Sequence, residues 1–310
     1  MSTQSYDKTR PFVIGTRGSP LALAQAEETR SRLMDAHGLP GDAFHIKVIK
    51  TTGDLVQNRP LSEIGGKGLF TKEIEEELLA GTIHIAVHSM KDVPTVLPDG
   101  LHISTVLPRE EVCDVFISES YDSIEALPKG ALFGSSSLRR RAQLLSIRPD
   151  LKMVEFRGNV QTRLRKLSEG VASATLLARA GLSRLGQADL GHDVPATTLL
   201  PAIAQGAVGI EQRDDDQATS EMLAPIHDSE TELRITAERA FLKALDGSCR
   251  TPIAGLATLS GDTLAFEGEV LRPDGSETVK TSRSGPVSDA IRLGDDAAQE
   301  LIGRGARAFY

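Results

Sequence analysis

The chain has 310 residues, 40% of them apolar and 25% charged, which is typical of a globular protein with two or three domains. A net charge of −8 and an aromatic content of 4% argue against nucleic-acid and membrane partners, because both attract basic surfaces and single strands stack on aromatic rings. Two cysteines, Cys113 and Cys249, are too few for a disulfide framework.

The expected compartment is the cytoplasm. The first ten residues lack the apolar stretch of a signal peptide, and no run has the length of a membrane span. Both thiols are therefore expected to be reduced. The seven histidines are scattered and no metal-binding spacing occurs, so no metal site is expected.

Strand and helix signals alternate over the first two hundred residues, which predicts α/β units with mostly parallel sheets. Ser19 and Pro20 have the residue types of an N-cap and a first helical position. The segment 51–68 has no regular period and three glycines near its end, as in a lid or a binding segment. The first expected strands and helices lie at 12–14, 20–36, 46–49 and 69–80.

A polar cluster follows a short apolar strand expected at 83–87. It contains four residues that can move protons or bind anions, namely His88, Ser89, Lys91 and Asp92. In α/β sheets, ligands bind where strands end at the carboxyl edge, and a lysine beside an aspartate can hold an anion and move a proton there. The alternative is a solvated loop with an ordinary ion pair, and the spacing alone favours neither.

After Pro108 the alternation restarts, and beyond residue 230 it changes to an α+β pattern. The segment 200–211 between these parts is apolar and contains glycine. Strands are expected at 115–117, 131–133, 153–156, 174–178, 253–259, 263–271 and 277–282. Helices are expected from 138, at 160–167, at 232–245 and at 288–303.

Residues 139–166 form the strongest electrostatic feature, with nine bases and only two acids, Asp150 and Glu155. Most charge runs are solvated helix faces. Here, however, the serines of 134–137 stand at a helix start directly before Arg139, which is the arrangement of an anion site. Arg157 follows another strand. Because arginine forks bind carboxylates bidentately, several of them favour a polycarboxylate ligand.

Cys249 lies in a loop between an expected helix and an expected strand. A free cysteine is most often a small buried hydrophobe. The neighbouring Gly247 and Arg250 instead favour an accessible thiol whose thiolate is stabilised by charge. The residues alone leave both interpretations open and favour the first.

Eight segments, in order over almost the whole chain, resemble the motifs of the porphobilinogen deaminase (hydroxymethylbilane synthase) family. Any one would be a weak signal, but eight in order are specific. The segments are Thr16-Arg-Gly-Ser-Pro-Leu-Ala-Leu23, Gly65-Gly-Lys-Gly-Leu-Phe70, Ala86-Val-His-Ser-Met-Lys-Asp-Val-Pro94, Gly134-Ser-Ser-Ser-Leu-Arg-Arg140, Arg157-Gly-Asn-Val-Gln-Thr-Arg163, Ala180-Gly-Leu-Ser-Arg-Leu-Gly186, Gln205-Gly-Ala-Val-Gly-Ile-Glu211 and Gly247-Ser-Cys249.

The resemblance implies a transferase that joins four porphobilinogen molecules head to tail with loss of ammonia and then releases linear hydroxymethylbilane by hydrolysis. It implies a dipyrromethane cofactor attached covalently through Cys249, and a monomer that hands its product to uroporphyrinogen-III synthase. The implied fold has two α/β domains of the type II periplasmic-binding-protein kind flanking a cleft, and a smaller α+β domain that carries the cysteine. Their expected bounds are 1–107 with 200–224, 108–199, and 225–310.

The resemblance also assigns residues. Asp92 contacts pyrrole N–H groups, stabilises the positive charge formed as ammonia leaves, and assists proton transfer. The acetate and propionate groups of each pyrrole explain why an acidic protein concentrates arginines. The implied cofactor-binding residues are Lys91, Ser137, Arg139 and Arg140. The implied substrate-binding residues are Arg17, Ser19, Arg157, Arg163 and Arg184, the last of which also helps the chain to extend. Lys67 falls in the implied lid.

Three positions depart from the family pattern. Glu63 stands at a lid position where some relatives have lysine, and Cys113 stands where arginine is common. Arg179 replaces a usually apolar residue, and either adds a carboxylate contact or lies at the surface, which we favour.

Two other classes of function compete with the enzyme. A non-catalytic carboxylate-binding protein of the same two-lobed type would not need Cys249. A regulatory protein that binds nucleic acid through residues 139–166 conflicts with the acidic charge and the scarcity of aromatic residues.

Overall fold

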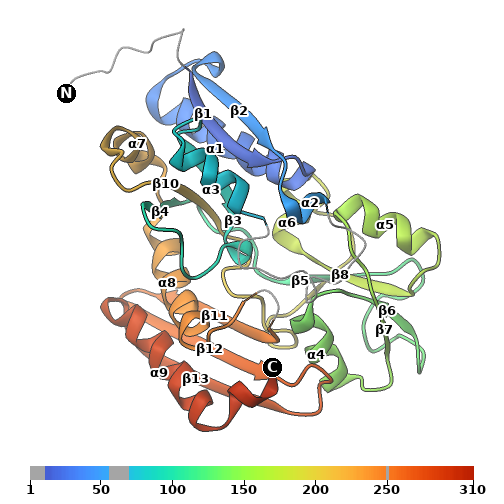
Figure 1. Cartoon of the computed structure of the whole chain (residues 1–310). Coiled ribbons are helices and arrows are strands. Elements are labelled where there is room, and N and C mark those ends of the chain that lie inside the picture. Colours follow the sequence, from blue (N-terminus) through green and yellow to red (C-terminus); the bar gives the residue numbers. More distant parts are fainter. Residues whose placement is uncertain (1–10, 56–69, 249–250) are drawn as a thin grey trace. The chain divides into compact units, whose positions relative to one another are not determined.

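The structure is a computed structural model that describes residues 11–55, 70–248 and 251–310 (Figure 1). These residues form two compact units. The first takes in 11–55, 70–108 and 207–231, and the second takes in 109–206 and 232–310 apart from residues 249 and 250. None of the described helices is long and apolar enough to cross a bilayer.

The first unit is built on a five-stranded sheet with the order β2-β1-β3-β10-β4. β1 pairs in parallel with β2 and β3, whereas β10 pairs antiparallel with β3 and β4. The strands are β1 (Phe12–Arg17), β2 (Phe44–Ile49), β3 (Ile85–Ser89), β4 (Leu101–Val106) and β10 (Val208–Arg213). The α-helices are α1 (Pro20–His37), α2 (Thr52–Leu55), α3 (Lys72–Leu79) and α7 (Gln217–Leu223).

Both faces of this sheet are covered. Ile85 and Val87 of β3 pack into one hydrophobic core, which also contains Leu33 of α1. Ile83 and Ala86 pack into a second core with Leu78 of α3. Burial on both faces explains why Ile85, Ala86 and Val87 of β3 are consecutive apolar residues rather than alternating with polar ones.

The second unit contains a sheet of the same design, with the order β7-β6-β8-β5-β9. The two sheets correspond strand by strand: β7 to β2, β6 to β1, β8 to β3, β5 to β10 and β9 to β4. β5 is antiparallel to both of its neighbours, β8 and β9. The strands are β5 (Asp114–Ile117), β6 (Leu132–Gly134), β7 (Lys152–Val154), β8 (Ala174–Ala178) and β9 (His192–Val194), and the helices are α4 (Leu138–Ile147), α5 (Val160–Ser168) and α6 (Arg179–Arg184).

The expectation of mostly parallel sheets was wrong in this respect, because two of the four pairings in each sheet are antiparallel. Each sheet receives one strand from a segment outside its consecutive parallel strands, β10 in one case and β5 in the other. That strand enters in the opposite direction and pairs on both sides.

The last third of the chain forms an antiparallel three-stranded sheet, as the α+β pattern predicted. Phe241 of α8 packs against Phe266 of β12, with ring centroids 5.0 Å apart, and α9 packs on β12 and β13. The elements are β11 (Ile253–Ser260), β12 (Thr263–Leu271), β13 (Thr278–Pro286), α8 (Ser229–Ala244) and α9 (Ala290–Gly303). The division into three domains with the bounds given above stays a prediction.

Candidate active site

Four of the expected site residues lie at one edge of the first sheet. Arg17 is the last residue of β1, and Ser19 caps α1 by accepting a hydrogen bond from the Ala22 N–H at 3.2 Å. Lys91 and Asp92 belong to a single 3-10 turn, Met90–Asp92, directly after β3. Because β1 and β3 are parallel neighbours, their carboxyl ends meet at the same edge.

Asp92 is half-buried, and its carboxylate has no hydrogen-bond or ion-pair partner among the residues that the structure describes. The turn beneath it is held firmly. The Met90 N–H donates to the Ala207 carbonyl at 3.0 Å, and the Met90 side chain is buried against β10. A Cβ at Gly209 would lie 2.0 Å from the Met90 sulfur, so the glycine leaves room for the Met90 side chain in its present position. The backbone thus fixes Asp92 and leaves its carboxylate available.

The side chains of His88 and Ser89, which were expected to belong to the polar cluster, form hydrogen bonds within this unit. The buried His88 ring contacts Glu211 of β10, with 3.0 Å between Nε2 and Oε2. Ser89 exchanges hydrogen bonds with Gln25 of α1. Burial raises the pKa of nearby Glu75, and the Glu211 charge adds to this effect. His88 and Ser89 therefore drop out of the expected ligand-binding cluster, and Lys91 and Asp92 are its remaining candidates.

In the second unit, three serines shape the start of α4. Ser137 is its N-cap and accepts from the Arg140 N–H at 3.4 Å. Ser136 accepts from the Phe156 N–H at 2.9 Å, and Ser135 accepts from the Ser137 N–H at 3.3 Å. Each hydroxyl uses its oxygen as the acceptor and keeps its own hydrogen to donate. The expected helix start is therefore formed with Ser137 as its N-cap, and its binding of an anion stays a prediction.

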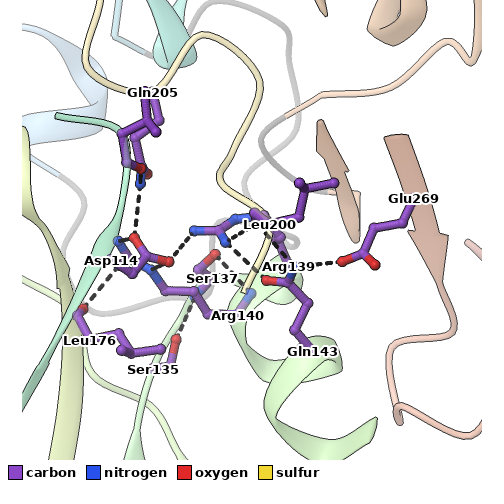
Figure 2. Close-up of polar contacts among 11 residues, drawn as sticks. Asp114, Ser135, Ser137, Arg139, Arg140, Gln143, Leu176, Leu200, Gln205 and Glu269 are labelled. Carbon is purple, nitrogen blue, oxygen red and sulfur yellow. Dashed lines mark hydrogen bonds and ion pairs between the residues drawn. The ribbon is translucent and has the colours of Figure 1, made fainter. Parts of the chain in front are cut away.

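Arg139 and Arg140 are buried, with 4% and 6% of their surface exposed, and share one internal carboxylate (Figure 2). Asp114 of β5 accepts from Arg139 Nη2 at 2.7 Å, and from Arg140 Nη2 and Nε at 2.7 and 3.1 Å. Asp114 lies outside residues 139–166. It was therefore not among the two acids, Asp150 and Glu155, that the sequence set against the nine bases of that segment. Gln205 also donates to Asp114, at 2.9 Å.

The charges in this cluster are stable over the ordinary pH range. Burial alone would raise the pKa of Asp114, but the two guanidinium groups outweigh it and hold that pKa well below its usual range. Burial lowers the pKa of Arg139, and the Asp114 charge opposes this effect. An arginine remains protonated even when its pKa is lowered.

The other expected arginines of this unit lie on its loop 157–159, on α5 and on α6. Gly158 has a φ of 120°, and a Cβ there would meet the Thr162 side chain at 2.5 Å. Arg163 Nε donates to the Gly158 carbonyl at 3.0 Å, which ties α5 to the loop that carries Arg157. Arg184 Nη1 donates to the Gly206 carbonyl at 3.1 Å.

Two of the three departures from the family pattern meet in one buried cluster. Arg179 is 9% exposed and donates through Nε to Asp193 at 2.6 Å, so our expectation of a surface position was wrong. Its backbone N–H donates to the Cys113 carbonyl at 3.1 Å. The Cys113 thiol is free and buried. Three expected residues, Glu63, Lys67 and Cys249, lie outside the described residues. The sequence did not point to Asp114 because no local pattern marks it.

The second unit fits a ligand rich in carboxylates. At the start of α4, Arg139 and Arg140 carry two positive charges against the single negative charge of Asp114, and the serine hydroxyls there keep hydrogens to donate. The Arg139 Nε is buried and has no hydrogen-bond partner among the described residues, so one donor still lacks an acceptor. No group of three or more metal-ligating side chains occurs in the described parts of the chain.

Two α/β sheets of one topology, with polar residues at the carboxyl edges of their parallel strands, and an added antiparallel sheet place the described residues in the mixed α/β class of proteins. Residues 12–221 match the family model for the "dipyromethane cofactor binding domain" of porphobilinogen deaminase, and residues 232–303 match the model for its C-terminal domain. The chain belongs to the porphobilinogen deaminase family.

Curated relatives match over almost the whole length. The chain is 61% identical over 309 residues to a porphobilinogen deaminase of Paracoccus denitrificans, covering 99% of each chain. It is 54% identical to one of Nitrobacter winogradskyi, covering 99% of this chain and 98% of the relative. The solved structure of the methionine binding protein MetQ is 13% identical, with a TM-score of 0.43 over 73% of this chain and 93% of that one.

Proposed function

We propose that this chain is a hydroxymethylbilane synthase, a transferase that joins four porphobilinogen molecules head to tail and releases the linear product by hydrolysis. Two family models that together match most of the chain support this proposal. The dipyrromethane cofactor, when bound, supplies the terminal pyrrole to which each new unit is joined. Its covalent attachment through Cys249 is part of the proposal.

The observation that carries the proposal is the available carboxylate of Asp92. Loss of ammonia from porphobilinogen leaves positive charge on the pyrrole system. A carboxylate that is half-buried and has no internal partner among the described residues can accept a pyrrole N–H and stabilise that charge. It can also take the proton that the joined pyrrole carbon must lose. The buried Met90 and the turn at Met90–Asp92 hold it in position.

The cations bind the acetate and propionate groups. Arg139 and Arg140 hold cofactor carboxylates, Ser137 donates its remaining hydroxyl hydrogen, and Lys91 places a further charge beside Asp92. Substrate carboxylates are held by Arg17, Ser19, Arg157, Arg163 and Arg184, with Arg184 also assisting extension. Lys67 belongs to the lid. We further propose a monomer that works in the cytoplasm and hands its product to uroporphyrinogen-III synthase, as the family resemblance implies.

Substituting Asp92→Asn tests this role, because the side chain keeps its size and loses its charge. We expect the variant to carry the cofactor yet to release ammonia at least about a hundredfold more slowly. Asp99→Asn is the matched control, since Asp99 is exposed in the same unit, and it should keep wild-type turnover. Full activity of Asp92→Asn would remove Asp92 from the reaction.

A further inference from the structure

Asp114 is the best-satisfied side chain of the arginine cluster, although no family motif identified above contains it. A carboxylate offers about four acceptor positions, and Asp114 uses four. Oδ1 accepts from Arg140 and Gln205, and Oδ2 accepts from Arg139 and Arg140, with all four distances between 2.7 and 3.1 Å. The side chain is fully buried.

The two arginines use Asp114 differently (Figure 2). Arg140 binds the Asp114 carboxylate bidentately through Nε and Nη2, and its Nη1 donates to the Leu176 carbonyl at 3.0 Å. Arg139 reaches Asp114 through Nη2 alone, while its Nη1 donates to Gln143 at 2.9 Å and to the Leu200 carbonyl at 2.7 Å. Its Nε is left with no described partner. All three nitrogens of Arg140 therefore donate within the protein, with one further N–H each on Nη1 and Nη2, whereas the Nε of Arg139 has no partner among the described residues.

The charges of the cluster do not cancel. Two guanidinium groups and one carboxylate leave the cluster with a net charge of +1. The next carboxylate outward, Glu269 of β12, accepts from Gln143 at 2.5 Å and is paired with Lys280 at 3.3 Å, so it does not change this balance. Without Asp114, two buried guanidinium groups side by side would repel each other and would both turn toward any anion.

We propose that Asp114 is a positioning residue of the reaction: it clamps Arg140, orients Arg139 with one donor open, and limits the arginine pair to a single excess charge. This inference rests on the proposed function, in which the pair holds cofactor carboxylates. Asp114 contacts neither substrate nor cofactor and acts through the two arginines. The expected consequence of its loss is a cofactor held in the wrong place rather than weaker binding of porphobilinogen.

The test compares Asp114→Asn with Asp150→Asn in the cofactor-bearing enzyme. Asp150 is the matched control, because it pairs with Arg148 through two hydrogen bonds of 2.8 and 2.9 Å in the same unit but outside the cluster. Intact mass gives the fraction of each protein that carries cofactor, and kcat is expressed per cofactor-bearing molecule. We expect Asp114→Asn to lower this kcat about tenfold or more and to keep KM for porphobilinogen within about twofold. Asp150→Asn should change neither.

A merely structural role would reduce the folded fraction and leave the kcat of each cofactor-bearing molecule unchanged, and that result would overturn the inference. If Asp114→Asn yields no cofactor-bearing protein, Asp114→Ala is purified and incubated with porphobilinogen in the presence of formate or of formamide. Recovery of cofactor and turnover with formate alone supports the need for a carboxylate between the arginines. Equal recovery with formamide, or none with either, overturns it. Absence of cofactor from the wild type would instead contradict the proposed function.

Discussion

Glu238 of α8 is a fully buried carboxylate that joins three segments of the second unit. Its Oε1 accepts from Arg109 Nη1 at 2.7 Å and from the Ala257 N–H at 2.9 Å. Its Oε2 accepts from Arg109 Nη2 at 3.0 Å and from the Ala204 N–H at 2.6 Å. Ala204 has a φ of 57°, a left-handed conformation that alanine rarely adopts, and this hydrogen bond helps to hold it.

Glu238→Gln keeps the shape of the side chain and removes its charge. Whichever way the amide is turned, its NH2 group faces two donors, one on Arg109 and one backbone N–H. Breaking a buried ion pair by removing one partner costs about 3–5 kcal/mol, and a stranded buried N–H costs about 1–3 kcal/mol. These costs overlap, and the amide oxygen still accepts two bonds. We therefore expect the free energy of unfolding to fall by about 4 kcal/mol, a large part of a total of about 5–15 kcal/mol.

Urea unfolding followed by far-UV circular dichroism measures this loss, with the m-value compared to show that both proteins unfold similarly. The control is Glu277→Gln, because Glu277 pairs with Arg272 at the surface, where the two side chains are 53% and 39% exposed. It should change the free energy of unfolding by no more than about 0.5 kcal/mol. A loss below about 1 kcal/mol in Glu238→Gln would refute the reasoning about buried pairs in this unit.

Two further predictions concern pH. Burial raises the pKa of the Cys113 thiol to about 12. Iodoacetamide at pH 8 should therefore leave Cys113 unmodified in the folded protein and label it in urea, which peptide mass mapping would show. Rapid labelling of the folded protein would contradict this prediction. Burial and the Arg213 charge lower the pKa of His84, whose Nδ1 accepts from the Val13 N–H at 2.9 Å. Because the imidazole binds protons more readily in the unfolded protein, the free energy of unfolding should fall as pH drops below about 6.5. The His84→Asn variant should lose less of its free energy of unfolding over this range. An equal loss in both proteins would count against the role of His84.

Local patterns predicted the elements that depend on near neighbours. The strand at 174–178 has the predicted bounds, and Ser19 and Ser137 cap the helices that follow them. β10 carries no local sign of its direction or of its place between β3 and β4, because a sheet pairing depends on segments far apart in the chain. The strands β4 and β9 were missed as well. β9 has only three residues, and so short a strand gains its stability mainly from its neighbours.

The candidate site shows the same division. Residue type and position at strand ends marked Lys91, Asp92 and the arginines of α4. The same reasoning overestimated His88, whose partner Glu211 lies 123 residues further along the chain. It also missed Asp114, which stands 25 residues before Arg139 in an otherwise apolar strand. A buried charge is recognisable only together with its partner, and the fold alone brings those partners together.

We propose that this chain builds its product on a dipyrromethane held by Cys249, and the mass of the intact protein tests this proposal most directly. We predict that the wild type exceeds its sequence mass by one dipyrromethane, that Cys249→Ser does not, and that Cys113→Ser does. A wild-type protein that forms hydroxymethylbilane while its mass equals that of the unmodified sequence would contradict the account.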